Sequence, residues 1–146
     1  MEGLAASFVR IARLYFDCVS VQMGEAERVH PRQAPILGML LHNEGMSQAQ
    51  LARALNVTPA TVAVSVARLE RLGCLCRERN AHNQRANVLA LTPAGRAKAQ
   101  QLLEAMEAVK IAAFDGFSQE ELAQLGGYCA RMTQNLRGRY QPGEEK

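Results

Sequence analysis

Two helix-start signals, eleven residues apart, constrain the fold of this chain more than any other feature. The first, Ser47-Gln48-Ala49-Gln50, fits a capping box in which Ser47 caps the helix and Gln50 bonds back to it. The second, Thr58-Pro59, places a capping residue directly before a proline at the first helical position. Gly73 ends the second pattern. These signals predict a short helix to Leu55, a tight turn, and a second helix over 59–72.

One pattern within the second helix favours a strand instead. Val62, Val64 and Val66 alternate with smaller residues, and β-branched residues are poor helix formers. Val62 and Val66 nevertheless share one helical face with the leucines that follow, and both start and stop signals are present. We therefore expect a helix whose opposite face presents Thr61, Ser65 and Arg68.

The pattern changes after this helix. Residues 74–78 and 85–91 are typical of two short strands joined by a polar turn over 80–84, which predicts a β-hairpin. The tip of the hairpin carries Arg79, His82 and Arg85 and no acidic residue.

Helices are predicted on both sides of this central region. A segment over 4–23 has two apolar faces, so it is either the core helix of a monomer or is covered by a partner subunit. Pro31 opens a helix that ends near Asn43. Thr92-Pro93 starts a long helix to about Phe114, and a capping box at Ser118 opens the last helix.

Arginine is concentrated in the middle of the chain. Residues 47–96 contain seven arginines, no lysine and two acidic residues, a net charge of +5, whereas each flanking segment has a net charge of −1. Guanidinium groups bind phosphates and guanine edges through paired hydrogen bonds. This basic block favours a module that binds nucleic acid, and a solvated arginine-rich surface is the alternative.

The segment from Ser47 to Gly95 resembles the MarR family of winged-helix transcriptional regulators. The family's wing usually contains Asp-x-x-Asp-x-Arg, where this chain has Asn80-Ala81-His82-Asn83-Gln84-Arg85. Arg85 matches the family's arginine that enters the minor groove, and Asn83 stands where an acidic residue braces that arginine. The other matching residues are Leu51-Ala52-Arg53-Ala54-Leu55-Asn56-Val57, Thr61-Val62, Leu69-Glu70-Arg71-Leu72-Gly73, Arg77 and Leu91-Thr92-Pro93-Ala94-Gly95.

The resemblance implies a mostly α fold with a small β-hairpin wing. In a single MarR-like domain over 1–146, a winged helix-turn-helix lobe that binds DNA would span 31–92. Dimerisation helices would span 1–24 and 93–139, followed by a flexible tail over 140–146. The resemblance also implies a homodimer, whose recognition helices would meet successive major grooves of a pseudo-palindromic operator, about 10 base pairs apart.

Regulators of this family commonly repress genes, and many release DNA when a small aromatic or lipophilic effector binds between the dimer region and the winged domain. We expect DNA contacts from both capped helices and from the wing. Ser47 and Thr58 are caps in any case, and Thr61 and Ser65 are alternatively simple exposed residues. The expected DNA-binding residues are Ser47, Gln48, Thr58, Ala60, Thr61, Ser65, Arg68, Arg79, Asn83 and Arg85.

The four cysteines do not have the spacing of a disulfide framework. Cys74 stands where the MarR family usually has Leu, so the resemblance implies that it is a core residue, and Cys129 falls on the apolar seam of the last helix and is also predicted to be a core residue. Cys76 is predicted to be the likeliest of the four to be exposed. Some members of the family sense oxidants through a cysteine in the first helix, where this chain has Cys18. Its neighbours do not favour the thiolate, so a redox role is a secondary hypothesis.

A metal-responsive regulator is a further alternative, through His30, His42 and Glu44, although the later helices contain no histidine. A winged helix that binds proteins instead of DNA is another alternative. The sequence shows no nucleophile–base pair and no phosphate-binding glycine loop, so we expect neither an enzyme nor a cofactor. No apolar run reaches the roughly 18 residues of a membrane helix, and no signal pattern is present, so we expect a cytoplasmic protein.

Overall fold

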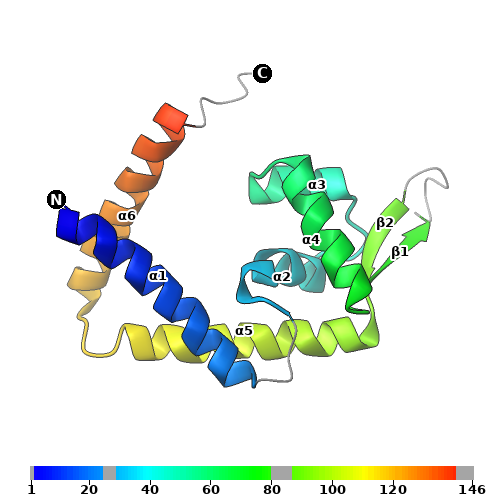
Figure 1. Cartoon of the computed structure of the whole chain (residues 1–146), viewed down its shortest axis with the longest axis horizontal. Helices are drawn as coiled ribbons and strands as arrows, with labels where there is room; N and C mark the ends of the chain where they lie inside the picture. The colour runs from blue at the N-terminus through cyan, green and yellow to red at the C-terminus, as the bar shows by residue number, and fades with distance from the viewer. Residues whose placement is uncertain (1, 25–28, 80–86, 141–146) are drawn as a thin grey trace. The chain divides into compact units, whose positions relative to one another are not determined.

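The computed structural model describes residues 2–24, 29–79 and 87–140, and the fold is mostly α with a two-stranded hairpin, as predicted (Figure 1). Residues up to Lys110 form one compact unit and residues from Ile111 form a second. In chain order the elements are α1 (Glu2–Met23), the 3-10 helix η1 (Pro31–Gln33), α2 (Ala34–His42), α3 (Gln48–Leu55), α4 (Pro59–Arg71), β1 (Leu75–Arg79), β2 (Asn87–Leu91), α5 (Pro93–Ala113) and α6 (Gln119–Tyr140).

The two capping signals form as the sequence predicts. The Ser47 hydroxyl accepts a hydrogen bond from the Gln50 backbone N–H at 3.2 Å, and the Ser47 N–H donates to the Gln50 side chain at 2.8 Å. Asn56 ends α3 in the left-handed conformation, with a φ of 51°. The Thr58 hydroxyl then accepts from the Thr61 N–H at 3.2 Å and starts α4. A helix-turn-helix is therefore confirmed at residues 48–71.

The segment with alternating valines is helical. Val62 and Val66 are fully buried on the inner face of α4, whereas Val64 is 72% exposed on the other side. The alternation of valines therefore does not indicate a strand. The helix is stabilised by its cap and by the burial of one face. The helix ends at Arg71, one residue earlier than predicted, and Gly73 follows with a φ of 69°.

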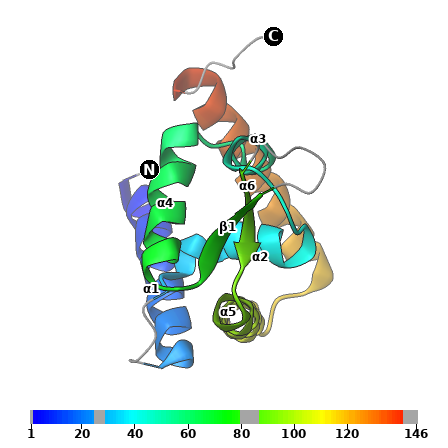
Figure 2. The ribbon, with the colours of Figure 1, turned by 90° about the vertical axis from the view of Figure 1, so that its right-hand side faces the viewer.

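The hairpin is antiparallel, and Leu75 pairs with Leu91 at its base. β1 begins at Leu75, not at Cys74, because the Cys74 N–H bonds back to the Leu69 carbonyl at the end of α4. A bridge from Met46 to Leu89 adds a short third pairing that the sequence did not reveal. β1 contacts α4 and β2 contacts α2, so the hairpin lies between these helices (Figure 2). The predicted turn over 80–84 and the first residues of the second predicted strand lie outside the described residues.

The predicted helix from Pro31 begins as a 3-10 turn, and the α-helix starts only at Ala34. The reason is Pro35, which has no N–H to donate to the Pro31 carbonyl four residues earlier. That carbonyl accepts from the Ala34 N–H instead, which closes a 3-10 bond. Gln33, the last residue of this 3-10 turn, lies in the interior and is 5% exposed.

The hydrophobic core lies in the first unit. Leu37, Leu51, Leu69, Leu89 and Leu102 are fully buried and come from α2, α3, α4, β2 and α5. Among the helices that the structure describes, none combines the length and apolar character needed to cross a lipid bilayer.

The helices expected to dimerise leave much apolar surface open. α1 buries Val19 and Met23, but Ile11 is 63% exposed and Val9 is 72% exposed. α6 has no buried residue along its described length. The prediction that Cys129 is a core residue is therefore wrong, because Cys129 is exposed on α6.

Candidate nucleic-acid interface

The first turn of α4 presents the short polar side chains expected of a recognition helix. Thr58, Ala60 and Thr61 are all exposed. The Thr58 and Thr61 hydroxyls lie 2.9 Å apart and share a hydrogen bond. Hydroxyls with spare lone pairs, together with the free N–H groups of a helix N-terminus, can bind phosphate or base edges. The structure therefore brings these three predicted residues together at one exposed end of α4.

The other predicted residues are dispersed. Ser47 and Gln48 are half-buried at the start of α3, and the Ser47 hydroxyl is used as a cap. Arg79 is exposed at the end of β1. Asn83 and Arg85, the expected wing residues, lie outside the described residues, as does His82.

A salt bridge joins α4 to the hairpin, and the sequence analysis missed it. The Arg77 Nε on β1 donates to one oxygen of Glu70 at 2.8 Å, and its Nη2 donates to the other at 3.3 Å. A bidentate pair of this kind fixes direction as well as distance. It sets the hairpin against the C-terminal end of α4. The only signal in the sequence was one acid in an otherwise basic helix end.

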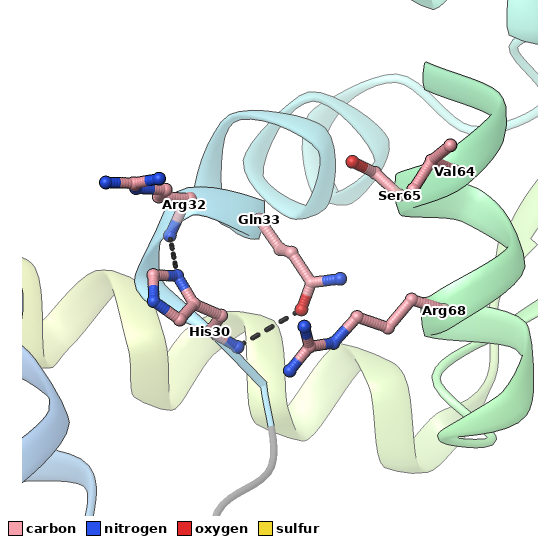
Figure 3. Close-up of a pocket in the computed structure, with 6 residues that line it drawn as sticks. All are labelled: His30, Arg32, Gln33, Val64, Ser65 and Arg68. Atoms are coloured by element: carbon pink, nitrogen blue, oxygen red, sulfur yellow. Dashed lines mark hydrogen bonds between the residues drawn. The ribbon is translucent and has the colours of Figure 1, made fainter. Parts of the chain in front are cut away.

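Ser65 and Arg68, which are predicted to contact DNA, line a pocket between α4 and η1, where Ser65 is half-buried and Arg68 is exposed (Figure 3). The pocket has a volume of about 320 Å³. Its lining residues are His30, Arg32, Gln33, Val64, Ser65 and Arg68.

Gln33 is the buried polar residue of this pocket. Its Oε1 accepts a hydrogen bond from the His30 backbone N–H at 3.1 Å. Its Nε2 is buried and has no hydrogen-bond partner among the described residues. Figure 3 shows this nitrogen facing the side of the pocket formed by Ser65 and Arg68. Sequence reasoning missed Gln33, although His30 and Gln33 are spaced like a capping box.

His30 lies beside two cations, Arg32 and Arg68. Its Nδ1 accepts from the Arg32 backbone N–H at 3.1 Å, so that nitrogen carries no proton. Desolvation, followed by the positive charges of Arg32 and Arg68, lowers the pKa of His30 below its usual range. The Arg32 guanidinium lies 5.6 Å from the ring centroid of Phe16 and points away from the pocket (Figure 3). Arg68 is therefore the cation that faces Gln33.

The cysteines and histidines do not form a metal centre in the part of the chain that the structure describes, which holds no group of three or more potential ligands. Cys74 is buried, as predicted. Cys18 and Cys129 are exposed, and Cys76 is only half-exposed because it lies within β1, so the prediction that Cys76 is the likeliest thiol to be exposed is wrong.

Comparison with known proteins finds a family pattern in the central part of the chain. Residues 29–86 match a family model described as MarR family. A protein from Pseudomonas aeruginosa, described as a probable transcriptional regulator, has a TM-score of 0.70 at 26% identity, covering 88% of this chain and 96% of that chain.

Two further solved structures share the fold. The MepR–DNA complex of S. aureus has a TM-score of 0.77 at 22% identity and covers 90% of this chain and 97% of that chain. The PcaV transcriptional regulator of Streptomyces coelicolor, in complex with its natural ligand, has a TM-score of 0.74 at 21% identity and covers 90% of this chain and 89% of that chain. The resemblance seen in the sequence is thereby confirmed: the chain has the winged-helix fold of the MarR family of transcriptional regulators, and residues 29–86 carry the family's sequence pattern.

Proposed function

We propose that the chain is a dimeric, sequence-specific DNA-binding repressor that is released by a small-molecule effector. One observation carries this proposal: α4 starts with an exposed Thr58, Ala60 and Thr61 and is set in a segment with a net charge of +5. An α-helix fits the major groove of B-DNA, and its N-terminal side chains are the ones that reach base edges. The fold shared with MepR, whose structure contains DNA, supports this use of α4.

The proposed contacts divide by role. Thr58, Ala60 and Thr61 face base edges in the major groove, where the alanine and threonine methyl groups suit thymine. Ser47 and Gln48 contact the backbone from α3, and Arg68 reaches phosphate or guanine from α4. Arg79, Asn83 and Arg85 of the wing follow the adjacent minor groove.

A second copy of the chain is the partner for the apolar helices. The exposed apolar residues of α1 and α6 include Val9, Ile11, Val21 and Leu136, all at least 60% exposed. Exposed apolar surface of this extent marks an interface. In the proposed dimer, residues 1–24 and 93–139 form the dimerisation region and 31–92 the DNA-binding lobe, so two copies of α4 face successive major grooves.

The experiment that tests this function is a binding measurement on the DNA upstream of the protein's own gene, with scrambled DNA of equal length, at two salt concentrations. We expect tight binding to the upstream DNA and a steep loss of affinity as salt rises, since each phosphate neutralised adds nearly one unit to the slope of log K against log salt. Weak binding that ignores sequence, in fresh reductant, would contradict the proposal and favour a winged helix that binds proteins. A change in affinity with oxidant or chelator would favour the thiol- or metal-responsive alternative.

A further inference from the structure

Val64, the middle one of the three alternating valines, is not explained by the fold. Val62 and Val66 are fully buried and belong to the core, whereas Val64 is 72% exposed on the other side of α4. A β-branched residue inside a helix is less favourable than alanine, and burial usually offsets that cost. Because Val64 gains little burial, neither helix stability nor packing accounts for a valine at this position.

The position of Val64 places it on the face of α4 proposed to meet DNA. Among the described residues of the 31–92 lobe, the exposed large apolar side chains are Val64 and Val57, and Val57 is 41% exposed in the turn that precedes the helix. Ala60, Val64 and Arg68 follow one another at four-residue steps, so they share one helical face. Val64 therefore lies between a residue proposed to face bases and one proposed to reach phosphate or guanine.

The first turns of α4 lack the side chains that discriminate most bases. Residues 59–67 contain no arginine, lysine, asparagine, glutamine, aspartate or glutamate, the types that pair with guanine, adenine or cytosine in the major groove. The Thr58 and Thr61 hydroxyls bond to each other at 2.9 Å, and Thr58 also accepts from the Thr61 N–H, so part of their bonding capacity is used within the helix. The base-specific contact that remains is an apolar side chain against the methyl group of thymine.

The charge around Val64 favours DNA over an apolar protein partner. Arg68 is exposed and makes no ion pair among the described residues. Glu70, the only acidic residue of α4, is paired with Arg77, and the segment 47–96 has a net charge of +5. A protein-docking surface needs a contiguous apolar patch on the order of several hundred Å². One exposed valine within a positive surface suits a polyanion whose groove presents single methyl groups.

The spacing along α4 matches adjacent base pairs. Because an α-helix rises about 1.5 Å per residue, Val64 lies about 4.5 Å beyond Thr61 along the helix axis. The base pairs of B-DNA are stacked about 3.4 Å apart. When the first turn of α4 faces one pair, Val64 therefore comes against the next pair or the one after it.

We propose that Val64 determines the sequence specificity of this chain by packing on the 5-methyl group of a thymine in the major groove. Together with the methyl groups of Ala60 and Thr61, it selects half-sites that contain neighbouring T·A pairs. This inference rests on the proposed DNA-binding function and deepens it, because it names the class of half-site that α4 selects. The contact is apolar, so it adds discrimination between bases without adding a charge.

The experiment removes single methyl groups from the DNA. A binding site is first selected with the full chain from a library of random double-stranded DNA. Each thymine of the selected duplex is then replaced in turn by uracil, which removes the methyl group and leaves the hydrogen bonds of the base pair in place. At the thymine that Val64 contacts, fluorescence anisotropy should show about fourfold weaker binding for one changed half-site and about 15-fold for both.

Val64→Ala completes a double-mutant cycle with the uracil duplexes. The variant should bind the thymine duplex about fourfold more weakly for each half-site, and at the contacted position it should no longer distinguish thymine from uracil. Val57→Ala is the matched control, an exposed valine of the same lobe that precedes α4, and it should keep the fourfold preference. Urea denaturation should show no loss of stability for Val64→Ala, because alanine suits an exposed helix position better than valine.

The salt dependence of binding separates the methyl contact from a phosphate contact. Val64→Ala should leave the slope of log K against log salt unchanged, because no charge is removed. Arg68→Gln should lower that slope by about one unit if the arginine neutralises one phosphate. A lower slope in Val64→Ala would mean that the variant shifts α4 on the DNA, and the proposed methyl contact would be wrong.

The same measurements distinguish this inference from the DNA-binding function. If a specific site is selected but uracil has no effect at any thymine, or has the same effect in Val64→Ala, the role of Val64 is wrong and the regulator proposal stands. If Val64→Ala binds the thymine duplex as tightly as the natural chain does, the role of Val64 is also wrong, and its exposed side chain is left for a protein partner. If the selection returns no preferred sequence, the regulator proposal and this inference are both wrong.

Discussion

At Gly95 a single hydrogen atom in place of a side chain allows α5 to start against the base of the hairpin. A Cβ at Gly95 would lie 1.8 Å from the Cys74 carbonyl oxygen, which is backbone and cannot move aside alone. The same carbonyl accepts the Thr92 N–H at 3.1 Å, so the first turn of α5 is fixed there. The segment Leu91-Thr92-Pro93-Ala94-Gly95 matches the family pattern, and packing explains its glycine, because no side chain fits at that position.

Gly95→Ala should therefore lower the free energy of unfolding by about 1–3 kcal/mol, as overpacked sites do. Urea denaturation measures the change. Gly38→Ala is the matched control within the same unit, because its nearest neighbour is the Leu103 side chain at 3.6 Å, an ordinary contact. Alanine inside α2 should be neutral or stabilising by up to about 1 kcal/mol. Equal effects at both positions would show that the close contact at Cys74 is not what excludes a side chain.

His30 should make folding stability depend on pH. Its pKa is lowered in the folded chain by desolvation and by Arg32 and Arg68, the two cations that face it, while the Phe16 ring flanks it at 6.3 Å. Below about pH 6.5 the unfolded chain therefore binds a proton that the folded chain binds less readily, and stability falls as pH falls.

His30→Asn keeps an acceptor for the Arg32 N–H and removes the titrating ring. Urea midpoints measured from pH 8 to 5.5 should fall less steeply for this variant than for the natural chain. His42→Asn, which changes a histidine outside the pocket, should follow the natural chain. Parallel curves for His30→Asn and the natural chain would rule out His30 as the source of the dependence.

At the scale of elements, the helix-turn-helix could be predicted because its determinants are local. The caps at Ser47 and Thr58 bond to residues three positions away, and this spacing can be read from sequence. The 3-10 turn before α2 can be deduced from Pro35, but only when the acceptor of each backbone N–H near it is worked out in turn. The Glu70–Arg77 pair and the orphan amide of Gln33 depend on how elements pack, which no periodicity encodes.

The salt bridge between α4 and the hairpin should matter more for DNA binding than for folding. The Glu70 and Arg77 side chains are partly exposed, so the pair contributes no more than about 1 kcal/mol. Glu70→Gln removes a negative charge, which alone would strengthen DNA binding. We expect instead a loss of operator affinity of about two- to fivefold, because the hairpin is no longer fixed against the recognition helix.

Glu78→Gln is the matched control, since it removes the same charge from β1 without touching Arg77. Fluorescence anisotropy at fixed salt should show equal or tighter operator binding for Glu78→Gln and weaker binding for Glu70→Gln. Tighter binding by both variants would mean that the pair has no part in placing the wing.

At the scale of the whole molecule, the sequence did not decide whether the first helix is the core helix of a monomer or part of a dimer interface. Val19 and Met23 of α1 are buried, while Val9, Ile11 and Val21 are each at least 63% exposed, so among the described residues α1 packs on the core through one face of its C-terminal half. The core of α2 to α5 is complete without the rest of α1. The proposed second copy would cover apolar positions that the described residues of one chain leave exposed.

Two valines with the same exposure test that conclusion. Val9 on α1 and Val64 on α4 are each 72% exposed, but only Val9 lies in the proposed dimer interface. Val9→Glu would bury a charge between two copies, so sedimentation should show a monomer at concentrations where the natural chain is a dimer. Val64→Glu should remain a dimer, because in the proposed complex α4 faces DNA and not the partner. The dimer proposal is wrong if Val9→Glu remains a dimer, or if the natural chain is a monomer at every concentration. The exposed face of α1 would then have no proposed partner, and the spacing of two α4 helices along DNA would lose its structural basis.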